Sequence, residues 1–153
     1  MKKLLIVSHT PSPKTHAMTK AVFRGASHVD IDGIEVILTK PLESGPEDVL
    51  DADAIILGTT ENFGYMSGAL KDFFDRIYYP CLDKTESLPF AMFIRAGNDG
   101  HGACSSIERI VKGLTWKQVQ EPLICCGTWQ DSFADQCEEL GMTVAAGLEA
   151  GIF

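Results

Sequence analysis

The stretch from residue 54 to residue 79 constrains the fold more than any other part of the chain. It opens with Ala54-Ile55-Ile56-Leu57, a short apolar run rich in β-branched residues, which suits a strand buried on both faces. A polar loop follows, and apolar residues then recur at the spacing of one helical face: Met66, Ala69, Leu70, Phe73, Phe74 and Ile77. Pro80 is expected to end this helix. Strand, loop and helix together make half of a βαβ unit.

The same alternation of strand and helix runs along the whole chain. Strands are expected at residues 3–7, 34–38, 54–57, 89–94 and 119–126. Helices are expected after an N-cap at Thr15, at 66–79, at about 103–114 and at 132–149 after a cap at Asp131, with one short helix at most, at 46–50, between residues 39 and 53. Pro122 places the last strand at an edge or at a bulge. We therefore expect one domain over residues 1–153, an α/β fold with a three-layer, doubly wound, five-stranded parallel sheet.

Composition excludes several classes of function. A formal net charge of −8 argues against a nucleic-acid partner, because phosphate binding needs clustered Lys and Arg. No apolar run approaches the roughly 18 residues of a membrane span, so none is expected. The 5 cysteines form no Cys-x-x-Cys pair, which fits reduced thiols and a cytoplasmic location. The adjacent pair Cys125-Cys126 is interpreted as packing, because nothing nearby supplies the spacing of metal ligands.

Three polar loops follow the first, third and fourth strands, and in a parallel sheet they share the carboxyl edge, where ligands bind. The first, residues 8–15, is rich in hydroxyl groups, which either bind phosphate or serve ordinary helix capping. The second carries Phe63 and Tyr65, which could flank a flat ring, although Phe63 could instead be a hydrophobic staple for the following helix. The third, residues 95–102, has glycines that let a backbone approach a ligand closely.

Common catalytic motifs are absent from these loops. The third loop reads Gly-x-x-Gly-x-Gly, which is not the Gly-x-Gly-x-x-Gly order of a dinucleotide fingerprint. The sequence has neither a P-loop nor a Gly-x-Ser-x-Gly nucleophile elbow. His9, His16 and His101 lie on or beside the expected ligand edge without metal spacing, and we interpret them as polar loop contacts.

The second loop and its helix resemble a known family. The sequence Phe63-Gly64-Tyr65-Met66-Ser67-Gly68, continued by Ala69-Leu70-Lys71-Asp72-Phe73-Phe74-Asp75-Arg76, is similar to the second flavin loop of the flavodoxin-like FMN proteins. The nearest branch is that of the NAD(P)H-dependent FMN reductases and the tryptophan-repressor-binding-type quinone reductases. The resemblance implies a flavodoxin-like sheet of strand order 2-1-3-4-5 with FMN at its carboxyl edge.

By the same resemblance, residues of all three loops are expected to bind FMN. They are Ser8, Thr10, Lys14 and Thr15 for the phosphate; Thr59, Thr60, Glu61, Asn62, Phe63, Gly64 and Tyr65 for the ribityl chain and ring; and Gly97, Asn98, Gly100 and Gly102 for the other side of the ring. His16 and Ala96 are also expected among the residues that bind the cofactor. Pro13 offers no N–H, so Lys14 and the hydroxyl groups are expected to bind the phosphate. Glu61 is expected to disfavour a negatively charged reduced flavin. A bulky side chain at Gly97 or Gly100 is expected to abolish FMN binding without unfolding the protein.

The function that follows from the resemblance is an NAD(P)H-dependent oxidoreductase. It would pass electrons through FMN to a small acceptor, with no catalytic side chain of its own, because the flavin supplies the chemistry. The resemblance also suggests a homo-oligomer. An electron-carrier flavodoxin, favoured by the acidic charge, and a flavin-less binding protein, favoured by the altered first loop, stay open as alternatives. A response-regulator receiver is set aside, because Ser8-His9 stands where paired acids are needed.

Overall fold

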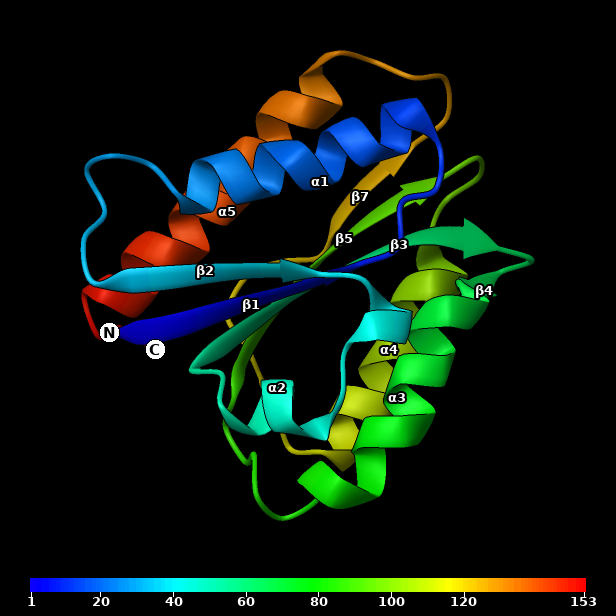
Figure 1. Ribbon diagram of the computed structural model, residues 1–153. Helices are drawn as coiled ribbons and strands as arrows, with labels where there is room; N and C mark the ends of the chain where they lie inside the picture. The colour runs from blue at the N-terminus through cyan, green and yellow to red at the C-terminus, as the bar shows by residue number, and fades with distance from the viewer.

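A computed structural model describes residues 1–153 and has three layers (Figure 1). The central sheet has the order β2-β1-β3-β5, with two short strands, β6 and β7, both pairing with β5. Its parallel strands are β1 (Lys2–Ser8), β2 (Ile34–Thr39), β3 (Ala54–Asn62), β5 (Pro89–Ala96), β6 (Lys117–Gln118) and β7 (Leu123–Cys126). The predicted order 2-1-3-4-5 is confirmed, with β5 as the fourth strand and β6 and β7 together as the fifth. Pro122 lies between these two pieces at the sheet edge, as predicted.

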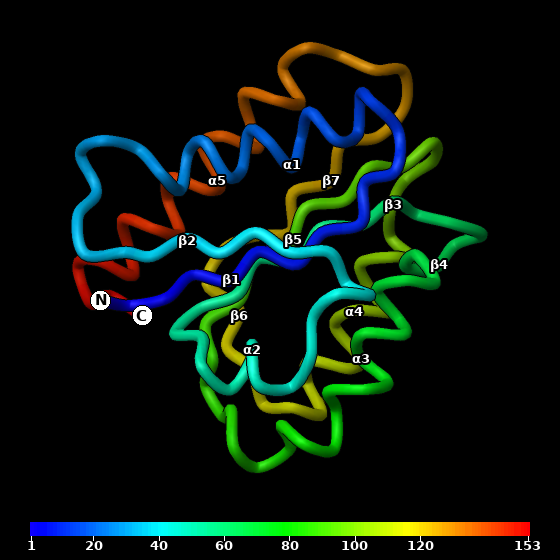
Figure 2. Tube along the Cα trace, in the orientation of Figure 1, coloured from blue at the N-terminus to red at the C-terminus, as the bar shows by residue number.

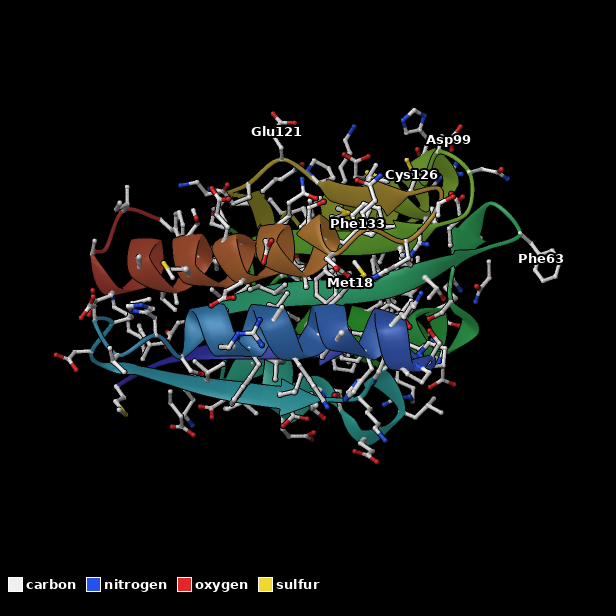
Figure 3. All side chains as sticks on the ribbon, turned by 90° about the horizontal axis from the view of Figure 1, so that it is seen from above. Met18, Phe63, Asp99, Glu121, Cys126 and Phe133 are labelled. Carbon is white, nitrogen blue, oxygen red and sulfur yellow. The ribbon has the colours of Figure 1, made fainter.

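Helices cover both faces of the sheet. On one face, α1 (Pro13–Ala26) and α5 (Ser132–Glu149) lie side by side (Figure 3). On the other lie α2 (Pro46–Leu50), α3 (Gly68–Cys81), α4 (His101–Gly113) and the 3₁₀-helix η1 (Pro41–Glu43) (Figure 1). The two chain ends lie together at the opposite end of the sheet from the β1–α1 loop (Figure 2).

The sheet separates two hydrophobic cores. Along β1, Leu4 and Ile6 belong to the core of 17 buried residues under α1 and α5, whereas Leu5 and Val7 belong to the core of 22 under α3 and α4. Successive residues of a strand point to opposite faces, so a strand covered on both sides needs an unbroken apolar run. This is the pattern from which the first and third strands were predicted.

The predicted cap of the first helix at Thr15 is wrong. Helix α1 begins at Pro13, and Ser12 is the N-cap, with its side chain accepting a hydrogen bond from the backbone N–H of Thr15. Thr15 completes a capping box from the third helical position. Pro13 fits the first position because that N–H has no partner within the helix.

Two further helix ends differ from the sequence prediction. Pro80 lies inside the last turn of α3 and removes one hydrogen bond to the preceding turn, and the helix ends one residue later, at Cys81. Asp131 occupies the N-cap position of α5, but its carboxylate accepts a hydrogen bond from Trp129 Nε1 at 3.3 Å and caps nothing.

The second predicted loop is largely a hairpin. Strand β3 continues through residues 58–62, turns at Phe63 and Gly64, and pairs with β4 (Tyr65–Met66) in antiparallel fashion. The segment between β2 and β3 contains both η1 and α2, although one short helix at most was expected there. No helix has the length and apolarity needed to cross a membrane.

Candidate functional site

The carboxyl edge of the sheet brings the three predicted loops together. The first loop touches the base of the second, since His9 N donates to the carbonyl of Gly58 at 2.9 Å. The second touches the start of α4: a β-carbon added at Gly102 would lie 2.0 Å from the carbonyl oxygen of Gly64. Only a glycine permits this close approach of two backbones. The predicted loops therefore form one continuous edge.

A cleft of about 820 Å³ opens at this edge, between the first loop and the segment after β2. Its lining residues are Ser8, His9, Thr10, Pro11, Ser12, Pro13, His16, Thr19, Leu38, Thr39, Lys40, Pro41, Leu42, Glu43 and Ala69. Of the predicted site residues, Ser8, Thr10 and His16 line the cleft, whereas Lys14 and Thr15 do not. No predicted residue of the second or third loop lines it.

The first-loop hydroxyls are already hydrogen-bonded within the protein. Thr19 Oγ1 lies 2.6 Å from Ser8 Oγ and 2.7 Å from Thr10 Oγ1, and all three residues are buried. Thr15 Oγ1 accepts from the N–H of Ser12 and lies 2.7 Å from Ser12 Oγ. Thr15 thus serves helix capping, the alternative kept open from the sequence. Lys14 is exposed on the first turn of α1.

His9 carries the one buried side-chain nitrogen or oxygen atom in the structure without a hydrogen-bond partner, Nδ1. Burial lowers the pKa of His9 below its ordinary value, because a charged imidazole loses hydration there. The neutral ring therefore predominates at pH 7. A buried polar atom without a partner indicates where a ligand or water belongs, and His9 lines the cleft.

The hairpin of the second loop is held firmly against α4. Glu61 Oε2 accepts from the backbone N–H of Ala103 at 3.1 Å, and Met66 N donates to Ser106 Oγ at 3.1 Å. Glu61 thus places its carboxylate at the positive end of α4, which stabilises a negative charge. This contact was not foreseen, and it gives Glu61 a structural role besides its expected effect on a flavin.

Two threonines of the second loop face other parts of that loop. Thr59 is fully buried, and its hydroxyl accepts from Ser67 N at 2.9 Å and donates to the carbonyl of Thr60 at 2.8 Å. Thr60 Oγ1 donates to Asn62 Oδ1 at 3.1 Å. The sequence placed both threonines toward a ligand, and the structure shows them shaping the hairpin.

Phe63 projects from the hairpin tip into solvent (Figure 3). It is 108% exposed and has a φ of 54°, a left-handed conformation that bulky residues rarely adopt. It packs on no helix, so the staple interpretation is wrong. Tyr65 is 41% exposed. Both rings are available to a flat ligand or to another chain.

The third loop is short and open. Gly97 and Asn98 are exposed between β5 and α4, whereas Ala96 and Gly100 are buried at its two ends. The N–H of His101 donates to Asp99 Oδ1 at 2.9 Å. The exposed part of the loop presents mainly backbone.

Arg95, at the start of the third loop, carries a positive charge to which the sequence analysis gave no role. Its guanidinium donates to the carbonyls of Ala96, Cys125 and Gly127 at 2.7, 3.1 and 2.7 Å. Its Cζ lies 5.2 Å from the ring centre of Phe133, a cation–π distance. A fixed positive charge therefore stands beside the third loop. An arginine in an otherwise apolar strand was the signal available.

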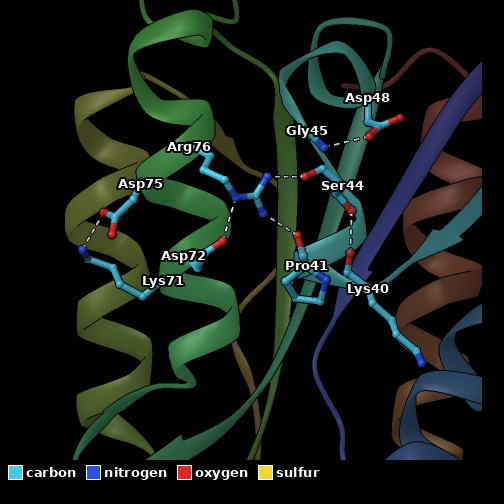
Figure 4. A network of polar contacts seen from close by, with 9 residues as sticks. All are labelled: Lys40, Pro41, Ser44, Gly45, Asp48, Lys71, Asp72, Asp75 and Arg76. Atoms are coloured by element: carbon cyan, nitrogen blue, oxygen red, sulfur yellow. Dashed lines mark hydrogen bonds and ion pairs between the residues drawn. The ribbon is translucent and has the colours of Figure 1, made fainter.

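The second wall of the cleft is also fixed by an arginine, Arg76 of α3 (Figure 4). Its guanidinium donates to the carbonyls of Ser44 and Pro41 at 2.6 and 2.7 Å and pairs with Asp72 at 2.6 Å. These contacts join α3 to the segment around η1. No pattern in the sequence predicted that this segment forms a wall of the cleft.

Comparison with known proteins shows to which family the chain is similar. The sequence model of a family described as "NADPH-dependent FMN reductase" matches residues 12–120, more than half of the chain. A protein named flavodoxin from Aquifex aeolicus (strain VF5) is 33% identical over 110 residues, which cover 70% of this chain. The chain spans 58% of the length of that relative.

Solved structures share the fold at low sequence identity. A flavodoxin from the domain Archaea superposes with a TM-score of 0.77 at 21% identity, covering 94% of this chain and 96% of that one. A flavodoxin, WrbA-like protein from Agrobacterium tumefaciens gives a TM-score of 0.73 at 20% identity, covering 97% and 99%. Both likenesses support the parallel sheet and its flanking helices.

Proposed function

The chain belongs to the NADPH-dependent FMN reductase family, and from this premise we propose that it is an oxidoreductase that takes electrons from a nicotinamide nucleotide and passes them to a small acceptor. Its cofactor is FMN, as the resemblance implied. The observation that carries the proposal is the meeting of three polar loops at one sheet edge, beside a cleft of about 820 Å³. Ligands of parallel α/β sheets bind at this edge.

The residues at the edge fit FMN in kind. The cleft offers hydroxyl donors and an unpartnered His9 nitrogen, and it lies at the N-terminus of α1, which favours a phosphate group. The exposed rings of Phe63 and Tyr65 and the open backbone of Gly97 suit a flat, partly polar ring. Lys14 lies outside the cleft, so we assign the phosphate to the loop backbone, Ser12 and the buried hydroxyls.

The protein's part in the chemistry is positioning and electrostatics. Bound FMN supplies the two-electron redox chemistry. Arg95 holds a positive charge beside the third loop, and the N-terminus of α4 offsets the carboxylate of Glu61. Both arrangements favour negative charge at this edge. We therefore expect the carboxylate of Glu61 to disfavour a negatively charged reduced flavin less than the sequence alone indicated.

An absorption spectrum tests the proposal directly. Apo protein is incubated with FMN, desalted and scanned in the visible range, and we expect retained flavin bands. Anaerobic addition of NADPH should then bleach these bands with no other protein present. A protein that stays colourless after desalting would refute flavin binding and favour the flavin-less alternative.

The formal charge of −8 and the likeness to flavodoxins support a second candidate, an electron carrier. Such a carrier needs a partner reductase, because it has no site for a nicotinamide nucleotide. FMN-loaded protein that keeps its bands in NADPH, yet bleaches when a flavodoxin reductase is added, would select the carrier. A homo-oligomer belongs to the proposal as well, and light scattering of the FMN-loaded protein measures it.

A further inference from the structure

We propose that Thr19 is a positioning residue for the phosphate of FMN, acting through a buried cluster of three hydroxyls. The cluster consists of Ser8 at the end of β1, Thr10 in the first loop and Thr19 on the second turn of α1. Thr19 Oγ1 is the junction, 2.6 Å from Ser8 Oγ and 2.7 Å from Thr10 Oγ1. The inference rests on the proposed function, since it concerns the same ligand.

Counting protons shows that the cluster has a donor to spare. Each hydroxyl carries one O–H proton, and the two hydrogen bonds of the cluster use one proton each. One O–H proton is therefore left over, whichever oxygen donates within each pair. The three oxygen atoms make no hydrogen bond outside the cluster. A buried donor without an acceptor is costly, so the remaining proton needs a partner.

The cleft is the place where that partner can lie. Ser8, Thr10 and Thr19 are 5%, 9% and 3% exposed, and each of them lines the cleft. His9, from the same loop, adds an independent sign, because its buried Nδ1 has no partner either. Two unmet polar groups at one cleft call for a ligand with several oxygens. A phosphate monoester meets this need, and an O–H donated to its charged oxygen is a strong hydrogen bond.

Thr19 matters because it joins the loop to the helix. Without its hydroxyl, Ser8 and Thr10 lose their shared partner, and the first loop must be ordered when the ligand binds. The effect should be confined to ligands that carry the phosphate. Riboflavin has the ring and ribityl chain of FMN but no phosphate, so it is the matched ligand.

The test titrates FMN and riboflavin into apo protein of the wild type, Thr19→Val and Thr19→Ser, followed by flavin fluorescence. Valine keeps the shape without the hydroxyl, and serine keeps the hydroxyl. We expect Thr19→Val to lose about tenfold in FMN affinity, because the side chains of Ser8 and Thr10 must then be ordered when the phosphate binds. Riboflavin affinity should change less than about twofold, and Thr19→Ser should restore FMN binding.

Each other outcome decides against the inference. The deciding quantity is the affinity for FMN divided by the affinity for riboflavin. If this ratio in Thr19→Val equals or exceeds that of the wild type, the inference is overturned, and an equal loss of affinity for both ligands is one such case. If Thr19→Val fails to fold in a urea titration, Thr10→Val takes its place, since it removes one bond and leaves the Ser8 pair. A smaller fall of the ratio is then expected, and an unchanged ratio overturns the inference.

Failure of the proposed function is distinguishable from failure of this inference. If the wild type binds neither flavin, the proposed function fails, and inorganic phosphate then probes the cluster alone. Phosphate, compared with chloride of equal ionic strength, should raise the melting temperature of the wild type and not that of Thr19→Val. Equal shifts for both proteins would overturn the role of Thr19.

Discussion

Gly97 and Gly100 look alike in the sequence of the third loop and differ in their surroundings. A β-carbon at Gly97 would have no atom within 4 Å, whereas at Gly100 it would lie 2.5 Å from Ile124 Cγ2, on a backbone with a φ of +74°. The expectation that either glycine could be replaced without unfolding is therefore wrong for Gly100. Its backbone needs glycine, and its neighbour leaves no room.

This difference predicts opposite results for two valine variants. Gly97→Val should keep the free energy of unfolding within about 0.5 kcal/mol and weaken FMN binding by filling the open loop. Gly100→Val should lose about 2 kcal/mol or more, from strain and overpacking. Urea unfolding and FMN titration of both variants provide the check. A Gly97→Val protein with wild-type FMN affinity would remove the third loop from the flavin site.

The five cysteines also differ in ways that only the structure shows. Cys126 is exposed, whereas Cys81, Cys104, Cys125 and Cys137 are buried. Burial raises the pKa of both Cys81 and Cys104 to about 11, which leaves little reactive thiolate at pH 8.

We expect iodoacetamide at pH 8 to add one label to the folded protein, on the peptide that contains Cys126, as read by mass spectrometry. Unfolding in urea should expose the other four cysteines to the reagent and allow them to be labelled. Cys126→Ser should then take up no label in the folded state. Early labelling of Cys81 or Cys104 would show that α3 or α4 opens on the timescale of the reaction.

At the scale of elements, the sequence predicted helices better than their ends and loops. The stripe from Met66 to Ile77 identified α3 because a helix docked on a sheet repeats its apolar face in the sequence. The hairpin at 58–66 was missed because it depends on distant partners, such as Glu61 with the start of α4. Thr15 was taken as a cap because Ser12 and Thr15 have the same chemistry, and only the backbone shows which one precedes the helix.

Arg76 offers a test of how two elements are joined. Arg76→Met removes the hydrogen bonds to the carbonyls of Ser44 and Pro41 together with the exposed ion pair to Asp72, and the loss should be about 1–2 kcal/mol of unfolding free energy. Lys71→Met is the matched control on the same helix, because it removes only the exposed ion pair with Asp75. That change should cost less than about 0.5 kcal/mol. Equal effects in urea unfolding would mean that the segment around η1 is not held by Arg76.

At the scale of the whole molecule, the fold was predictable and the cleft was only half predictable. A strand that is buried on both faces appears in the sequence as an unbroken apolar run. Because the crossovers between parallel strands are right-handed, such strands can be ordered in only a few ways. One wall of the cleft, residues 8–13, follows a predicted strand directly. The other wall, residues 38–43, is placed by contacts with α3 that leave no periodic mark in the sequence. Thr19 carried a weak signal, a hydroxyl on the apolar stripe of its helix between Met18 and Val22.

His9 links this site to the stability of the whole molecule. Burial lowers the pKa of His9 from its ordinary 6.5, so the unfolded chain takes up a proton more readily than the folded protein. Stability from this group is therefore present above pH 6.5 and is lost as the pH falls through the lower, folded value. We expect the urea midpoint of the wild type to fall more between pH 7 and pH 5 than that of His9→Gln.

The comparison isolates His9 because the two proteins share every other titrating group. His101→Gln is the control for the loss of a histidine as such, since His101 is exposed beside the third loop and lies outside the cleft. Bound FMN should reduce the dependence on His9, because a phosphate in the same cleft favours the charged imidazole and so brings the folded pKa of His9 back toward its unfolded value. Parallel pH curves for the wild type and His9→Gln would show that the His9 ring is hydrated in solution. The unpartnered nitrogen would then be met by water and would no longer argue for a ligand.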